Sequence, residues 1–119
     1  NFSNSIVNMM KQPPGNFIPY HTDGFFIFKE RFGDDKPIYR YQIFLEDWQP
    51  GQLFSFEPDY WTNWKKGDII FFEWQHTPHS TANTGFKDRP LLKITGTLQD
   101  ENWIMKAKNT GEITHFVYD

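Results

Sequence analysis

Two side chains near the beginning of the chain could together bind a metal ion. His21 and Asp23 are two residues apart, and on an extended strand such residues point to the same face, so both could contact one ion. A second imidazole from a distant strand would complete a set of two histidines and one carboxylate, which leaves open coordination positions in non-haem Fe(II) oxygenases. Alone, the tripeptide is more typical of a surface histidine and a turn aspartate before Gly24. Whether His21 and Asp23 bind a metal therefore depends on residues elsewhere in the chain.

The second histidine is predicted to be His79. It follows the apolar stretch 67–72 and comes directly after Pro78. His76 competes with it, but on extended backbone an offset of three residues puts two side chains on opposite faces, so at most one of them points inward. The downstream spacing to Arg89 favours His79.

Arg89 is the candidate for binding an anionic cosubstrate. It precedes the apolar stretch 91–97, and a guanidinium held rigidly there could bind a carboxylate through two parallel hydrogen bonds, which a lysine cannot form. The alternative is a loop arginine that pairs with Asp88 or with solvent.

The stretch 39–45 could supply further polar contacts. If its even-numbered face lines the interior, Arg40, Gln42 and Phe44 point into a cavity; if the odd face does, Tyr39 and Tyr41 do so instead. We favour the even face, because a buried arginine or glutamine needs hydrogen-bond partners and a bound dicarboxylate would supply them.

Strands are the elements that must position these residues, since aromatic and β-branched clusters alternate with Pro, Gly, Asn and Asp along the chain. The pattern predicts a mainly β fold with little helix, either a sandwich or a barrel-like jelly roll. The predicted strands cover residues 5–11, 16–22, 37–45, 53–57, 68–73, 79–82, 91–98, 103–108 and 113–117. Residues 23–37 are expected to form a loop that covers the site, and residues 59–64 a short helix or a loop.

Length and composition indicate one domain over residues 1–119. The 19% of aromatic residues predicts a densely packed interior or an apolar cavity, and a net charge of −3 without a basic stripe argues against a nucleic-acid partner. The absence of cysteine excludes disulfides and thiolate metal sites. With no apolar run long enough to span a membrane and no signal-peptide pattern, a cytoplasmic protein is expected, although a cysteine-free secreted one stays open. Because the chain begins with Asn1 rather than Met, an N-terminal truncation is also expected.

The order of His21, Asp23, His79 and Arg89 along residues 11–98 resembles that of the 2-oxoglutarate- and Fe(II)-dependent oxygenases. Their pattern is His-x-Asp, a distant His and then a basic residue. Several stretches are similar to the prolyl-hydroxylase-like members. They are the turn Pro14-Gly15-Asn16, the hairpin 44–53, the strand 67–72, the triplet Pro78-His79-Ser80 and the approach 83–89 to the basic residue.

The resemblance implies a double-stranded β-helix, which is a cupin-like jelly-roll barrel. Fe(II) would be bound by His21, Asp23 and His79, and 2-oxoglutarate by Arg89 with Gln42, Arg40 and Lys93 as further contacts. Such an enzyme would consume O2, hydroxylate a C–H bond and release succinate and CO2, with ascorbate in a supporting role. The substrate would be a small molecule or a peptidyl residue such as proline.

The chain departs from the family pattern at two positions. Members often carry Ser or Thr two positions after the arginine, where this chain has Leu91, so Lys93 could share or replace the role of Arg89. The aromatic hydroxyl common on the middle strand would fall at Phe44, so Gln42 or Arg40 could substitute for it. Gln75 and Asn83 are the nearest candidates for orienting the imidazoles.

Two other functions stay open on the same barrel. One is a different cupin-type metalloenzyme such as an isomerase, although such proteins usually place two histidines where this chain has His21 and Asp23. The other is a non-catalytic jelly-roll module that binds a ligand through its aromatic side chains.

Overall fold

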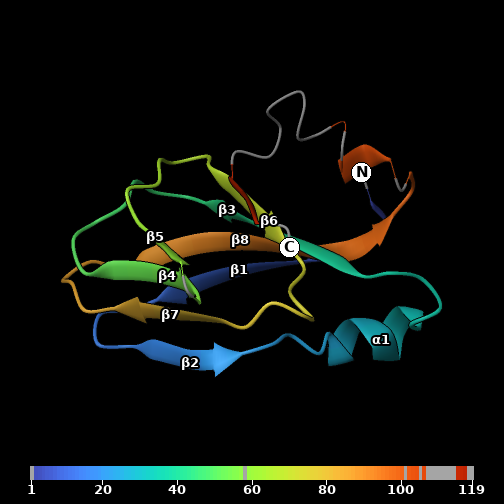
Figure 1. The fold of residues 1–119 in the computed structure, drawn as a ribbon, viewed down its shortest axis with the longest axis horizontal. Coiled ribbons are helices and arrows are strands. Elements are labelled where there is room, and N and C mark those ends of the chain that lie inside the picture. The colour runs from blue at the N-terminus through green and yellow to red at the C-terminus, as the bar shows by residue number, and fades with distance from the viewer. Residues whose placement is uncertain (1, 58, 101, 105, 107–114, 118–119) are drawn as a thin grey trace.

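Two facing β-sheets make up this computed structural model, which describes residues 2–57, 59–100, 102–104, 106 and, by backbone alone, 115–117 (Figure 1). The five-stranded sheet has the order β1 (Phe2–Gln12), β8 (Arg89–Leu98), β3 (Tyr39–Phe44), β6 (Ile69–Phe72) and β9 (His115–Val117). The four-stranded sheet has the order β2 (Phe17–His21), β7 (His79–Asn83), β4 (Gln52–Phe56) and β5 (Asp59–Trp61). Neighbouring strands are antiparallel except β6 and β9, which are parallel. The mainly β fold is confirmed.

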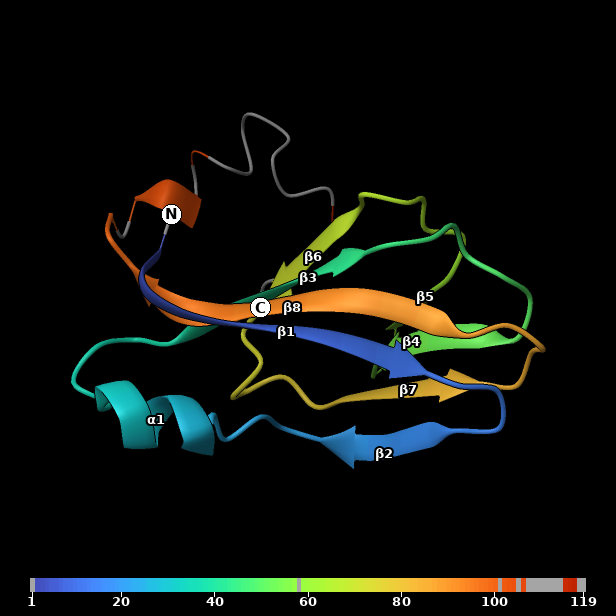
Figure 2. The ribbon, with the colours of Figure 1, turned by 180° about the vertical axis from the view of Figure 1, so that it is seen from behind.

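The chain passes repeatedly between the two sheets, since β1 and β3 lie in one and β2 and β4 in the other. This path leaves β1 and β2 as the outer strands of their sheets on the same side of the molecule (Figure 2). No helix among the described residues is long and apolar enough to cross a membrane.

Aromatic rings fill the space between the sheets. Phe54 on β4 and Phe72 on β6 come from opposite sheets and meet edge to face, with ring centroids 6.1 Å apart. Phe44 on β3 stacks on Trp64 at 4.4 Å, and both side chains are fully buried. Since each buried aromatic side chain removes about 150–250 Å² from water, these contacts dominate the stability of the sandwich.

The even-numbered face of β3 points into this core, as predicted. Gln42 and Phe44 are buried, whereas Tyr39, Tyr41 and Ile43 are only partly so. Tyr41 instead packs against Phe2 on the outer face of the sheet, with ring centroids 5.4 Å apart.

The expected loop over residues 23–37 contains a short helix, α1 (Phe26–Phe32), at one end of the sandwich (Figure 1). Phe25 and Phe28 are buried in the aromatic core and fix the first turn of this helix to it. Gly33, at a φ of 82°, ends the helix with its N–H donating to the carbonyl of Lys29. The sequence pattern missed α1 because so short a helix depends on tertiary packing rather than on periodicity.

Two further expectations are wrong. Residues 59–61 form strand β5 rather than a helix or loop, because they pair with β4 and place Trp61 edge to face with Phe44 at 5.0 Å. Trp103, Ile104 and Lys106 are helical rather than extended, because Asp100 binds the free N–H of Asn102 through Oδ1 at 2.9 Å and so caps a helical turn. Residues 105, 107 and 108 of that predicted strand, and 113–114 of the next, lie outside the described residues.

Candidate metal centre

Cross-strand pairing of β2 with β7 brings the two histidines together. Phe17 pairs with Ala82 and Ile18 with Thr81, but the register then shifts by one residue so that His21 lies opposite His79. Without this irregularity, Pro78 would face His21. A β-bulge of this kind re-aims side chains, and here it sets both imidazoles beside one another with ring centroids 4.4 Å apart.

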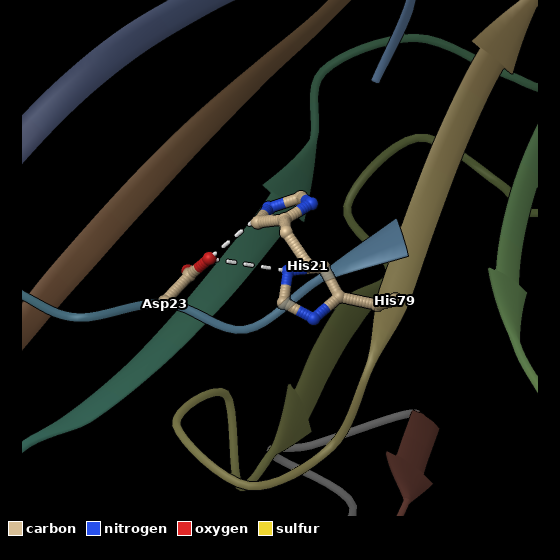
Figure 3. Close-up of side chains that lie close together, drawn as sticks. All are labelled: His21, Asp23 and His79. Atoms are coloured by element: carbon tan, nitrogen blue, oxygen red, sulfur yellow. Dashed lines mark ion pairs between the residues drawn. The ribbon is translucent and has the colours of Figure 1, made fainter. Parts of the chain in front are cut away.

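Asp23 completes the cluster from the segment that follows β2 (Figure 3). Its Oδ1 lies 3.2 Å from Nε2 of His21 and 3.2 Å from Nε2 of His79. One ligand atom from each of the three side chains falls within 4.8 Å of the others, so the group could hold a metal ion. The side chain of His21 is 39% exposed and that of His79 only 3%, so the cluster opens to solvent on the His21 side.

Both imidazoles are oriented by backbone carbonyls. Nδ1 of His21 is 2.8 Å from the carbonyl oxygen of Pro19, and Nδ1 of His79 is 2.9 Å from that of Thr77. A carbonyl only accepts, so each Nδ1 carries the proton and each Nε2 is left with a lone pair directed at Asp23. Three electron-rich atoms therefore converge, and a cation, either a proton or a metal ion, is required between them.

These carbonyls replace the partners expected from the sequence. Asn83 is buried elsewhere and binds the carbonyls of Gln12 and Lys87, at 3.0 and 2.7 Å. Gln75 does not orient either ring through Nδ1, because those atoms lie against the carbonyls of Pro19 and Thr77.

Asp23 is held from two sides although it lies beyond the end of β2. Its backbone N–H donates to the carbonyl of Trp74 at 2.8 Å, and its Oδ2 accepts a hydrogen bond from Nη1 of Arg40 in an ion pair. Burial acts to raise the pKa of the Asp23 carboxyl, but the interaction with His79 and the charge of Arg40 outweigh burial and hold the pKa below its ordinary value. The carboxylate is therefore ionised at neutral pH, with Oδ1 available to a metal.

Arg40 itself is fixed by three further contacts. Its Nε donates to Oγ1 of Thr95 at 2.7 Å, and its guanidinium lies over the rings of Phe25 and Trp74 at 4.7 and 5.8 Å. Arg40 was expected beside a bound cosubstrate; the structure pairs it with Asp23, and it does not line the cavity that the other three candidate contacts share.

One cavity of about 110 Å³ is lined by the two candidate metal-binding histidines and by the other three candidate contacts, which are Arg89, Gln42 and Lys93. Among the described residues, its lining contains basic side chains and no Asp or Glu. The two candidate metal-binding histidines and three of the predicted anion-binding residues thus line one cavity.

Arg89 is buried, and no acidic side chain of the described residues forms an ion pair with it. Its Nε donates to Oε1 of Gln12 at 3.1 Å, its guanidinium lies about 6 Å from the rings of Phe44, Phe54 and Trp64, and its Nη1 has no hydrogen-bond partner among the described residues. Burial lowers the pKa of Arg89 to about 10, so the side chain stays charged at neutral pH.

Lys93 and Gln42 add two more groups that could meet an anion. Burial, together with the charges of Arg40 and Arg89, lowers the pKa of Lys93 to about 8. Gln42 has a buried Oε1 with no hydrogen-bond partner in the described part of the chain, and an amide can present either its oxygen or its N–H groups to a ligand.

Several residues of the site carried no signal in the sequence. Gln12 reaches Arg89 because β1 and β8 pair them directly, and Thr95 reaches Arg40 because β8 and β3 pair them. Trp74 contributes its carbonyl to Asp23 and donates from Nε1 to the carbonyl of Arg40 at 2.8 Å. Cross-strand register, which local sequence does not reveal, decides the contacts of Gln12 and Thr95, and those of Trp74 depend on the turn that follows β6.

No protein-family model and no curated protein matches this chain in sequence. Solved structures do match its fold. One is a proposed sugar phosphate isomerase from Acidithiobacillus ferrooxidans, at a TM-score of 0.54 and 18% identity over 79% of this chain. A second is a predicted oxalate decarboxylase from Thermotoga maritima, at a TM-score of 0.53 and 22% identity over 78% of this chain. A third is a cupin 2 conserved barrel domain protein from Salinispora arenicola, at a TM-score of 0.51 and 10% identity over 89% of this chain.

These likenesses confirm the cupin-like jelly-roll fold. The chain spans 51%, 66% and 71% of the lengths of the three proteins, respectively. At such low identities the agreement concerns the fold, and the chemistry has to be argued from the side chains of the site.

Proposed function

We propose that this chain is a 2-oxoglutarate- and Fe(II)-dependent oxygenase that hydroxylates a C–H bond of its substrate, with release of succinate and CO2. The observation that supports it most is the shared cavity. The two histidines of a two-histidine, one-carboxylate ligand set line the same cavity as a buried arginine that, among the described residues, has an unpaired N–H and no acidic partner.

The donor set suits Fe(II). Bonds of about 2.1 Å set at right angles separate two donor atoms by about 3.0 Å, close to the 3.2 Å between Oδ1 of Asp23 and each imidazole Nε2. Two neutral imidazoles and one carboxylate bound through a single oxygen leave three adjacent positions for other ligands. Because Arg40 occupies Oδ2, Asp23 is kept from binding through both oxygens.

The cavity suits a dicarboxylate. Arg89 lies at its buried end with Nη1 unsatisfied, and Lys93 and Gln42 line the same space. A carboxylate would satisfy the guanidinium and compensate its buried charge, which explains why a costly unpaired cation is placed there. Fe(II) and 2-oxoglutarate, when bound, supply the activation of O2 for which no side chain is suited.

The residues of the chain then have three tasks. His21, Asp23 and His79 hold the metal, and their backbone and arginine partners fix their orientation. Arg89 and Lys93 bind and orient the cosubstrate. Phe54 and Trp74, which line the cavity, exclude water from it.

The structural neighbours favour a second candidate, a different cupin-type metalloenzyme with isomerase or decarboxylase activity. A non-catalytic ligand-binding module on the same barrel is the third. Neither of these two functions explains directly why a metal ligand set lies beside a buried arginine without a counter-charge, whereas binding of an anionic cosubstrate does.

Anaerobic titration with Fe(II) and then 2-oxoglutarate tests the proposal. The intact chain should develop the weak visible charge-transfer band of an iron-bound 2-oxo acid and should unfold at a higher temperature with both ligands present. His79→Ala should lose the band. His76→Ala is the matched control, since His76 is exposed three residues away and should leave the band unchanged.

Either of two results would contradict the proposed site. The intact chain could fail to give a band or any stabilisation by 2-oxoglutarate, which would favour one of the other two functions. Alternatively, the band could persist in His79→Ala, which would exclude the proposed triad.

A further inference from the structure

A second and larger cavity, of about 580 Å³, adjoins the metal centre at Asp23. Its walls come from the outer strand β1, from the segment that follows β2 and from α1, and Arg40 and Thr95 close it on the inner side. Neither candidate metal-binding histidine lines it, and neither does any of the three proposed cosubstrate contacts. The two cavities therefore meet the ligand set from different sides.

The walls of this cavity expose apolar side chains that the fold leaves uncovered. Phe26 is 80% exposed, Ile27 70% and Val7 56%. The ring of Phe26 lies directly over Gly24, where a Cβ would come within 2.5 Å of Cε2, so this ring stands next to Asp23. Covering large apolar side chains that surround one hollow removes them from water, so a ligand with an apolar body is stabilised there.

The side chains that line this cavity carry a net positive charge. Asp23, Arg31 and Arg40 are its charged side chains, and Asp23 is already paired with Arg40. Arg31, in the last turn of α1, forms no ion pair with any residue that the structure describes. An anionic group on a ligand would find this guanidinium at the rim.

We propose that this cavity binds the substrate of the oxygenase, and that the substrate is a small molecule with an apolar body and one carboxylate. The volume falls within the range of about 300–1,000 Å³ that is usual for small-molecule sites. The apolar body would lie against Phe26 and Ile27, and the carboxylate on Arg31. The role as substrate rests on the proposed function, whereas the binding site stands on its own residues.

A series of three probes that differ only in one group tests the site. They are 4-phenylbutyrate, 4-phenylbutan-1-ol and 4-phenylbutylamine, titrated calorimetrically into the full chain without iron or 2-oxoglutarate. The acid should bind at least about tenfold more tightly than the alcohol, as one charge-assisted hydrogen bond predicts, and the amine should bind most weakly. Phe26→Ala should weaken the acid and the alcohol alike.

Arg31→Gln should abolish the advantage of the acid. Lys36→Gln is the matched control, since it removes one nearby exposed charge outside the cavity and should leave the advantage intact. Arg89→Met should also leave it intact, because Arg89 lines only the smaller cavity.

Equal affinity for acid and alcohol, or an advantage that survives in Arg31→Gln, would overturn the proposal. So would an advantage that disappears in Arg89→Met, because the acid would then be bound in the smaller cavity. No iron or 2-oxoglutarate is present, so failure here is separate from failure to form the charge-transfer band.

Discussion

Replacing Arg89 with methionine should stabilise the ligand-free protein while removing its affinity for 2-oxoglutarate. Arg89 is 4% exposed, and burial lowers its pKa to about 10, a shift equivalent to about 3 kcal/mol of unfavourable desolvation. Methionine would fill the same space among Phe44, Phe54 and Trp64 without a charge. Loss of the hydrogen bond to Gln12 would lower the free energy of unfolding by about 1 kcal/mol and so offset part of this gain.

The net expectation is a gain of about 2 kcal/mol in the free energy of unfolding, or about 8 °C in Tm for a domain of this size. Urea unfolding of the metal-free chain measures it. Anaerobic calorimetry on the Fe(II)-loaded chain should show 2-oxoglutarate binding to the native protein and none to Arg89→Met. At a hundredfold excess over Kd the native chain should therefore gain about 2.7 kcal/mol from the ligand, and the variant nothing.

Lys66→Met is the control, because it removes an exposed charge far from the site and should change stability by less than about 0.5 kcal/mol. Destabilisation of ligand-free Arg89→Met would refute the idea that the buried charge is uncompensated. Unchanged affinity for 2-oxoglutarate would refute the role of Arg89 in binding it and would direct attention to Lys93.

Two further predictions concern pH. The folded pKa of Lys93, about 8, lies below the 10.5 of the unfolded chain, so the unfolded chain binds more protons between these values. The ligand-free protein should therefore become more stable as pH rises from about 8 to 10.5, and urea unfolding of Lys93→Gln should show a smaller rise. Arg40→Gln removes a charge that lowers the pKa of Asp23, so that carboxyl should hold its proton to higher pH. The midpoint of Mn(II) binding, followed by calorimetry between pH 4 and 7, should shift upward with a loss of about tenfold in affinity, and Arg31→Gln should show neither effect.

Local spacing in the sequence was enough to predict part of the cluster formed by His21, Asp23 and His79. His21 and Asp23 are close in the chain, and His79 follows an apolar strand, so the cluster could be proposed from strand geometry and from the resemblance together. The alternation along β3 likewise predicted that Gln42 faces the interior. Both inferences depend on neighbours within a few residues.

Features that depend on pairing between distant strands could not be predicted. The bulge that sets His21 opposite His79 is a property of two strands, and the contact of Arg40 with Asp23 depends on how β3 lies against the segment after β2. The helix at Phe26–Phe32 forms because Phe25 and Phe28 are buried, and its seven residues are too few to show a period. The predicted strand at 103–108 is replaced by a helical turn that Asp100 caps through one hydrogen bond, and strand propensities do not include such a bond.

The three candidate ligands differ in how firmly the fold holds them. His79 lies on β7, which is paired on both sides, whereas His21 ends β2, an outer strand with one neighbour. Fraying of a strand end costs less than opening an inner strand, so the half of the site on β2 can open while the other half stays in place. Ion exchange would then begin at His21, and a bound ion would in turn fix the free end of β2 to the rest of the site. The metal would therefore stabilise the fold at the end of β2 in addition to its part in the reaction.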